Sequence, residues 1–265
     1  MSRATSKDGT SIAYDRQGGG PAVILVGGGL VDPVTGRAGR WENAPLAAEL
    51  AERFTVYNYD RRGRGDSGDT PPYAIEREVE DIAAVIGAAG GSAHLYGTSS
   101  GAGLAMHAAA AGLPVVKLAL WEPPYNVNGR PDLPADTASV YRELVEAGRR
   151  GDAAEYFMAK VVGMPPEFVA QARQAPWWAQ QEAIAHTLAY DATIMGDYTL
   201  PTDIAKAITV PTLLIVGGAS FGFMGETADA LAELIPNAQR ATVEGQAHNV
   251  DPAALAPVLE RFFAA

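Results

Sequence analysis

Residues 94–103 read HLYGTSSGAG, a short apolar run followed by two adjacent serines that stand between glycines. Within this stretch, residues 97–101 fit the pattern G-x-S-x-G with Ser99 at its centre. A strand pattern precedes it and a helix of small residues follows, which is the context in which a sharp turn presents a nucleophilic serine. The glycines allow the strained backbone, and the helix N-terminus favours developing negative charge. The pattern alone fits equally well a glycine-rich turn in which the serine caps the helix.

Strand and helix patterns alternate on both sides of this turn, which indicates a parallel sheet covered on both faces. Apolar runs predict strands at 10–16, 22–26, 55–59, 93–96, 115–121, 210–216 and 239–243. Helical spacing of apolar residues predicts helices at 45–54, 74–90, 102–112, 226–235 and 252–265. Residues 124–208 carry only helix and loop patterns, so we expect a helical insertion over the carboxyl edge of the sheet, where α/β proteins bind ligands.

Composition limits the classes of partner. The 265 residues are 48% hydrophobic and 19% charged, enough for a large core, and the net charge of -11 argues against nucleic acid and anionic membranes as partners. The chain has no cysteine, which excludes disulfides and thiolate catalysis. No apolar stretch is clean enough to span a membrane and no secretory signal is visible, so we expect a cytoplasmic protein. The oligomeric state stays open, a homodimer included.

A nucleophilic serine needs a base within hydrogen-bond reach, and the chain has four histidines. His94 falls in a predicted strand, His107 in a predicted helix and His186 in the insertion. His248 falls in the loop between the last strand and the last helix, which opens at the same edge of the sheet as Ser99. We therefore expect His248 to be the base.

Four motifs, in this order, resemble those of the α/β-hydrolase family. VILVGGGL (23–30) is similar to its third strand and oxyanion loop, YDRRGRGDSG (59–68) to the turn after its fourth strand, GTSSG to its nucleophile turn and GQAHNVDP (245–252) to its late histidine loop. The resemblance covers essentially the whole chain. It implies a doubly wound, mostly parallel eight-stranded sheet, with Ser99 as nucleophile and His248 as general base and then acid.

The resemblance also suggests a division of the chain. Residues 1–123 and 209–265 would form the hydrolase core, and residues 124–208 a mostly helical cap inserted after the sixth strand. The turn at 59–68 has a structural role in the family, as a hydrogen-bonded corner near the floor of the site.

The oxyanion loop reads Gly27-Gly28-Gly29, where the family often has His-Gly. Backbone N–H groups suffice to hold an oxyanion, and we assign them to Gly29, with Leu30 as the alternative, and to Ser100. A dinucleotide site is the rival interpretation, but no G-x-G-x-x-G follows the strand and the chain has no G-K-[ST]. We expect no cofactor, and without an HExxH or a close histidine pair we expect no metal.

The acid of the triad is less clear, because Ser220 stands where the family usually has an aspartate after strand seven. Glu122, at the end of the strand 115–121, is the candidate acid, since some members of the family place their acid there. The alternative is a structural hydrogen bond from Glu122. We expect Glu226 to lie in the first turn of its helix and Asp251 to cap the last helix.

Aromatic residues of the insertion and of the loop after strand seven could line an apolar pocket, although most such residues pack a cap onto a sheet. The candidate substrate-binding residues are Trp177, Trp178, Tyr190, Phe221 and Phe223. His186 and Asp191 could add polar contacts or assist proton transfer.

The sequence therefore predicts a serine hydrolase that acts on a small apolar carboxylic ester or lactone through an acyl-enzyme. Epoxide hydrolysis, carbon–carbon bond hydrolysis and perhydrolysis on the same fold stay open as alternatives. So does a non-catalytic protein that binds a small molecule, which the missing aspartate after strand seven favours and the retained serine, histidine and glycine loop disfavour.

Overall fold

The computed structural model describes residues 1–29 and 39–265, so the alternative oxyanion donor Leu30 lies outside the described residues. Eight strands form one sheet in the order β1-β2-β4-β3-β5-β6-β7-β8. β1 and β2 pair antiparallel, as do β2 and β4, and every pair from β4 onward is parallel. The strands are β1 (Ser2–Thr5), β2 (Ser11–Gly18), β3 (Ala22–Val26), β4 (Thr55–Tyr59), β5 (Ala93–Thr98), β6 (Val115–Trp121), β7 (Thr212–Gly217) and β8 (Ala238–Val243). This confirms the doubly wound, mostly parallel sheet.

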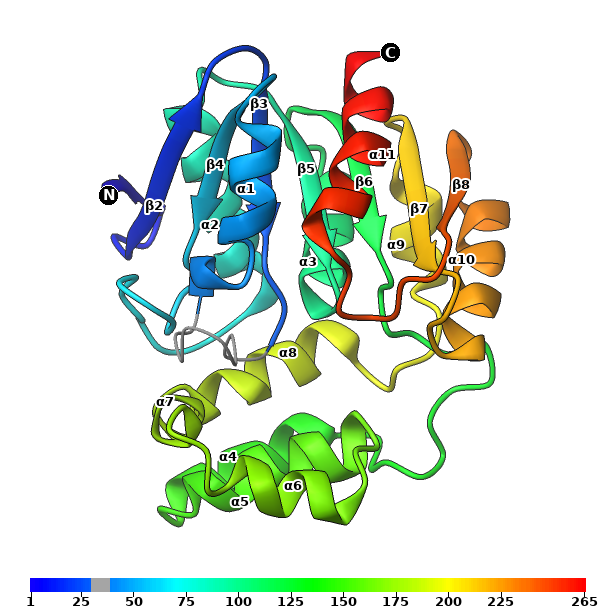
Figure 1. The fold of residues 1–265 in the computed structure, drawn as a ribbon. Helices are drawn as coiled ribbons and strands as arrows, with labels where there is room; N and C mark the ends of the chain where they lie inside the picture. Colours follow the sequence, from blue (N-terminus) through cyan, green and yellow to red (C-terminus); the bar gives the residue numbers. More distant parts are fainter. Residues whose placement is uncertain (30–38) are drawn as a thin grey trace.

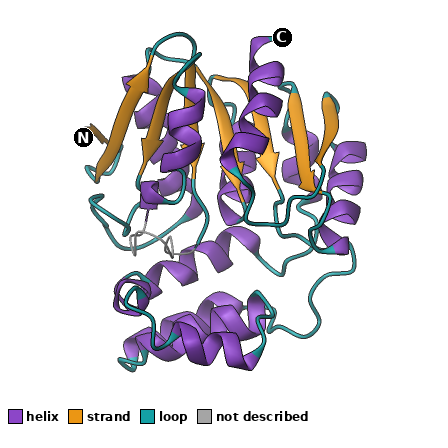
Figure 2. Cartoon of the chain, in the orientation of Figure 1, coloured by secondary structure: helices purple, strands orange, loops and turns teal. Residues whose placement is uncertain are grey.

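Helices cover both faces of the sheet, as Figure 2 shows. On β3, Val23 and Leu25 pack with α1 (Ala44–Leu50) and α11 (Pro252–Ala264), whereas Ile24 and Val26 face the other side. That second side carries α2 (Ile75–Ala88), α3 (Ser100–Ala110) and α10 (Gly222–Leu234). Because alternate strand residues point to opposite faces, a strand covered on both sides is apolar throughout.

The insertion between β6 and β7 is helical, and all of residues 124–208 are described and contain no strand. Its elements are α4 (Thr137–Glu146), α5 (Arg150–Tyr156), the π-helix η2 (Phe157–Val161), α6 (Pro166–Ala172), α7 (Trp178–Ala183), the 3₁₀ helix η3 (Ala185–Thr187), α8 (Leu188–Met195) and α9 (Thr202–Ala207). A further 3₁₀ helix, η1 (Gly39–Trp41), lies outside the insertion, before α1. Figure 1 shows α4 to α7 as a layer beyond the carboxyl ends of the strands, with α8 between that layer and the sheet. α9 instead packs against α3 and α10, beside the sheet.

Two expected helix starts had different outcomes. Asp251 caps α11, because its carboxylate accepts a hydrogen bond from the backbone N–H of Ala253 at 3.0 Å. α10 begins at Gly222, so the expectation that Glu226 lies in the first turn is wrong. Gly222 and Gly225 disfavour a helix, so the sequence pattern did not indicate that α10 begins before Glu226.

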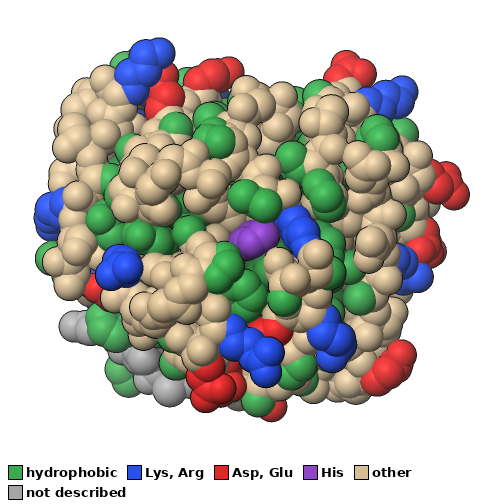
Figure 3. Space-filling model, turned by 90° about the horizontal axis from the view of Figure 1, so that it is seen from above, with side chains coloured by type: hydrophobic (Ala, Val, Ile, Leu, Met, Phe, Trp, Pro, Cys, Tyr) green, Lys and Arg blue, Asp and Glu red, His purple; other side chains and the backbone are tan. Residues whose placement is uncertain are grey.

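No helix among the described residues is long and apolar enough to cross a membrane. On the face seen in Figure 3, acidic and basic side chains are interspersed around the rim, with hydrophobic side chains between them. On that face, the negative charge of the chain is therefore spread out and does not form a single patch.

Candidate active site

Ser99 lies in a strained turn between β5 and α3. Its φ of 53° and ψ of -129° fall outside the regions that a residue with a β-carbon prefers. A β-carbon on Gly101 would lie 2.4 Å from the carbonyl oxygens of Val26 and Gly27, so only glycine lets the turn pack against the end of β3. The Ser99 side chain makes no capping hydrogen bond to α3, which removes the interpretation of Ser99 as a helix cap.

Glu122 holds the ring of His248. Nδ1 of His248 lies 2.6 Å from Oε2 of Glu122, and the Glu122 side chain is completely buried. Ser220, at the position where the family's aspartate is expected, donates its hydroxyl to Oε2 of Glu122 at 2.9 Å, and the N–H of Gly217 donates to Oε1 at 2.8 Å. The carboxylate therefore has three partners, which fix its orientation toward the imidazole.

The loop of His248 is anchored to the end of β6, the strand that precedes Glu122. The indole N–H of Trp121, the last residue of β6, donates to the carbonyl oxygen of His248 at 2.9 Å. Glu122 follows directly, with a φ of 44°. Adjacent residues at the end of β6 thus bind the backbone and the ring of His248.

The glycine loop after β3 reaches the same site. The N–H of Gly28 donates to Oε2 of Glu42 at 2.9 Å and is therefore engaged within the protein. Gly29, Ser99, Ser100 and His248 line one cavity. The N–H groups of Gly29, or alternatively Leu30, and of Ser100 therefore stay the expected oxyanion donors.

Two arginines of the 59–68 turn hold the glycine loop through its carbonyl oxygens. Arg64 donates to the carbonyl oxygen of Gly28, and Arg61 donates to that of Gly27 at 3.4 Å. Both guanidinium groups also bind Asp191 of α8, Arg61 at 2.7 Å. Burial opposes ionisation of Asp191, but Arg64 and Arg61 hold its pKa below the usual range. The turn thus links the insertion to the glycine loop, a contact that no pattern in the sequence indicates.

The cavity beside Ser99 has a volume of about 1010 Å³ and lies between the sheet edge and the insertion. Its wall is largely apolar, in keeping with a small-molecule site. Trp177, Phe221 and Phe223 line it, as expected, and so does Asp191.

Trp178 and Tyr190, expected in the substrate pocket, are not among the described residues that line this cavity. Trp178 is buried inside the insertion, and its indole N–H donates to Glu182 at 2.8 Å. Tyr190 stacks on Tyr73, with ring centroids 3.9 Å apart, and its hydroxyl donates to Asp69. Aromatic composition could not distinguish rings that pack the insertion from rings that face the cavity.

Two polar residues at the cavity were missed by the sequence analysis, Glu42 and Asn43, which lie between η1 and α1. Burial raises the pKa of the Glu42 carboxyl to about 7. They belong to no motif, and only the folded glycine loop brings them beside Ser99.

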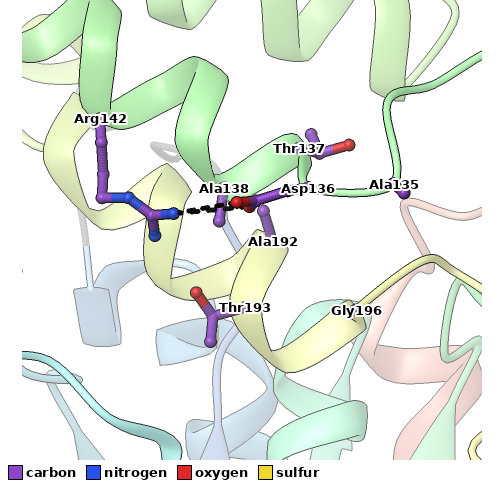
Figure 4. A pocket seen from close by; sticks show the side chains of 8 residues that line it. All are labelled: Ala135, Asp136, Thr137, Ala138, Arg142, Ala192, Thr193 and Gly196. Carbon is purple, nitrogen blue, oxygen red and sulfur yellow. Dashed lines mark hydrogen bonds and ion pairs between the residues drawn. The ribbon is translucent and has the colours of Figure 1, made fainter.

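A second, smaller cavity of about 260 Å³ lies where α4 begins beside the end of α8 (Figure 4). Arg142 reaches across it to Asp136, which caps α4 through the N–H of Ser139. Both charged side chains are exposed, so this ion pair stabilises the helix start only weakly. Neither here nor in any other described part of the chain are three acidic, histidine or cysteine side chains grouped to hold a metal ion.

Comparison with known proteins places this geometry in a family. A model of the alpha/beta hydrolase family matches residues 22–258. N-formylmaleamate deformylase of Pseudomonas putida is 31% identical over 260 residues, which cover 92% of this chain and 88% of the relative. An alpha/beta hydrolase from Sphaerobacter thermophilus superposes with a TM-score of 0.90 at 54% identity, over 99% of this chain and 100% of that one.

A thermophilic esterase from Thermogutta terrifontis, with malate bound, has a TM-score of 0.75 at 24% identity over 99% of this chain and 97% of its own, a likeness of fold alone. The match of the family model over most of the chain, together with the deformylase relative, shows that this chain belongs to the α/β-hydrolase family of enzymes.

Proposed function

We propose that this hydrolase cleaves a small carboxylic ester or lactone through an acyl-enzyme formed on Ser99. The observation that carries the proposal is the contact of 2.6 Å between Glu122 and His248, at the rim of a cavity that also contains a serine in a strained turn. A binding protein needs neither a buried carboxylate aimed at a histidine nor a serine at φ 53°. We further propose that residues 124–208 act as a cap that shapes this cavity.

The chemistry follows from the roles of the three side chains. His248 takes the proton of the Ser99 hydroxyl as its oxygen attacks the carbonyl carbon, and the N–H groups of Gly29 and Ser100 donate to the oxyanion. Glu122 stabilises the imidazolium. His248 then gives the proton to the leaving alkoxide, and water releases the acyl group by the same steps.

The deformylase relative favours a second candidate, hydrolysis of an N-formyl amide at the same serine. Both reactions pass through a tetrahedral intermediate and differ in the leaving group, which is an amine in the second case. An amine leaves only after protonation, so this candidate depends more strongly on proton delivery by His248.

Labelling with a fluorophosphonate, read by mass spectrometry of the intact protein, tests the nucleophile. We expect one adduct on Ser99 in the wild type, none in Ser99→Ala and His248→Ala, and slow labelling in Glu122→Gln. The matched control is His186→Ala, because His186 binds Arg150 and Asp69 outside the cavity and should label normally. No adduct in the wild type, or an adduct on another residue, would overturn the proposal.

A substrate panel then separates the two candidates. Aryl and alkyl esters, γ- and δ-lactones and N-formyl amides are compared by kcat/KM. Turnover of the formyl amides alone would exclude the ester assignment in favour of deformylation.

A further inference from the structure

Asn43 presents a buried hydrogen-bond donor that no described residue pairs with. Its side chain is 5% exposed and lines the cavity beside Ser99. It stands at the start of α1 without making a capping bond, and among the described residues Nδ2 has no acceptor. An unpaired buried donor is unfavourable, so a donor at a cavity wall is suited to an acceptor that a ligand supplies.

Glu42 places a second polar group next to Asn43. Oε2 accepts the N–H of Gly28, which leaves Oε1 for other partners. A β-carbon built on Gly28 would lie 3.3 Å from Oε1 of Glu42 and 3.3 Å from Cβ of Ser99, so Oε1 lies near Ser99. A β-carbon on Gly27 would lie 3.1 Å from Oε2 of Glu42 and 3.3 Å from Nδ2 of Asn43, so these two side chains are neighbours.

The charged groups that face the Glu42 carboxyl come from three other segments. Arg64 of the turn after β4 and His248 favour its ionised form, while Asp191 of α8 disfavours it. Burial dominates and raises its pKa to about 7. Below that pH the proton belongs on Oε1, because Oε2 is accepting a hydrogen bond, and Glu42 becomes a second donor beside Asn43.

We propose that Glu42 and Asn43 form a donor subsite that binds a second acceptor oxygen of the substrate, in addition to the carbonyl oxygen at the oxyanion site. The oxygen belongs to a keto, amide or carboxylate group near the bond that is cleaved. An aliphatic chain in the same place leaves the buried Asn43 donor and the half-buried Glu42 donor unpaired, which is how polar groups reject an analogue that lacks the matching group. The inference deepens the proposed function by naming the substrate class, but binding at this subsite needs no turnover.

The test measures binding by calorimetry on the full-length Ser99→Ala chain, so that it does not depend on Ser99 being the nucleophile. Benzyl 4-oxopentanoate and benzyl pentanoate differ in one keto oxygen. Monobenzyl fumarate and benzyl crotonate differ by a carboxylate in place of a methyl group. At pH 6 we expect at least one acceptor ligand to bind about 3- to 10-fold more tightly than its partner, the range for one net hydrogen bond. The pair that shows it identifies a neutral acceptor or a carboxylate.

Variants made in the same Ser99→Ala chain assign the preference to the subsite. Asn43→Ala should reduce it to less than about twofold. In the parent chain the preference should decline from pH 6 to pH 8 as Glu42 ionises. In Glu42→Gln it should persist at both pH values, because the amide oxygen can accept from Gly28 while the amide N–H₂ replaces the protonated Oε1. Glu49→Gln, the same change at an exposed position of α1, should behave as the parent.

Equal binding within both ligand pairs at pH 6 would overturn the proposal, as would a preference that neither Asn43→Ala nor pH alters. A missing fluorophosphonate adduct on Ser99 would overturn the proposed function and leave these binding results to decide the subsite separately. If Asn43→Ala does not fold, the pH profiles of the parent and of Glu42→Gln still decide it.

Discussion

Replacing Glu122 by glutamine removes the negative charge of the side chain and keeps its volume. The single oxygen of glutamine can accept from only one of Gly217 and Ser220, which bind different carboxylate oxygens of Glu122, and the side chain no longer stabilises the imidazolium of His248. The Nδ1–Oε2 distance of 2.6 Å puts the centres of the two charges about 4 Å apart, which is worth about 4 kcal/mol at an effective dielectric constant of about 20. We therefore expect kcat to decrease about 10³-fold.

The assay is steady-state hydrolysis of the best ester from the panel, with thermal unfolding as a check on folding. Ser220→Ala is the matched control, since it removes one hydrogen bond to Glu122 and keeps the charge, and it should reduce kcat less than about tenfold. Adding Ser220→Asp to Glu122→Gln should restore part of the rate, because residue 220 already contacts the acid site. A folded Glu122→Gln enzyme that retains more than a tenth of kcat would refute Glu122 as the acid.

Three further predictions concern the pocket, the turn and pH. Trp177→Ala should enlarge the cavity and favour longer esters in a chain-length panel, whereas Trp178→Ala should lower the free energy of unfolding by about 3–5 kcal/mol in urea, because that ring packs inside the insertion. Gly101→Ala should abolish labelling of Ser99, because its β-carbon would meet two carbonyl oxygens at 2.4 Å. Burial, and secondarily Lys117, lowers the pKa of His94 to about 4, so only the unfolded chain takes up this proton between about pH 6.5 and 4. Stability in urea should fall by up to about 3 kcal/mol on acidification across that range, and His94→Phe should lessen the fall.

Each of these predictions has an outcome that contradicts it. Equal loss of stability in Trp177→Ala and Trp178→Ala would mean that both rings pack alike. Normal labelling of Gly101→Ala would show that the turn can move away from β3. An unchanged pH dependence in His94→Phe would assign the acid sensitivity to other groups.

The turn and the sheet could be predicted because their signals are local. G-x-S-x-G follows an apolar strand, and alternate strand residues pack on opposite faces, so period and glycine spacing carry the information. The short strand β1 was not predicted individually, because its four residues SRAT carry too weak a pattern. Ser220 at the usual position of the acid left that role open, and the resemblance to family members with an acid after the sixth strand indicated Glu122, which the structure brings to His248.

Contacts between distant segments could not be predicted in the same way. Arg61 and Asp191 are 130 residues apart in sequence, and no pattern in either segment indicates the other. Trp177 and Trp178 are adjacent in sequence, yet only the first faces the cavity, and their difference depends on where α7 begins. Glu42 and Gly28 are 14 residues apart in sequence, and no sequence pattern indicates that they form a hydrogen bond.

The position of the Glu122 carboxylate directly after β6 has a consequence for how such an enzyme can diversify. Trp121 and Glu122 bind His248 directly, whereas the Gly217 N–H at the end of β7 and the Ser220 hydroxyl in the loop after it bind Glu122. The same loop leads into Phe221 and Phe223 on the cavity wall. Mutational libraries confined to residues 221–224 should therefore change the cavity wall while the contact between Glu122 and His248 stays in place.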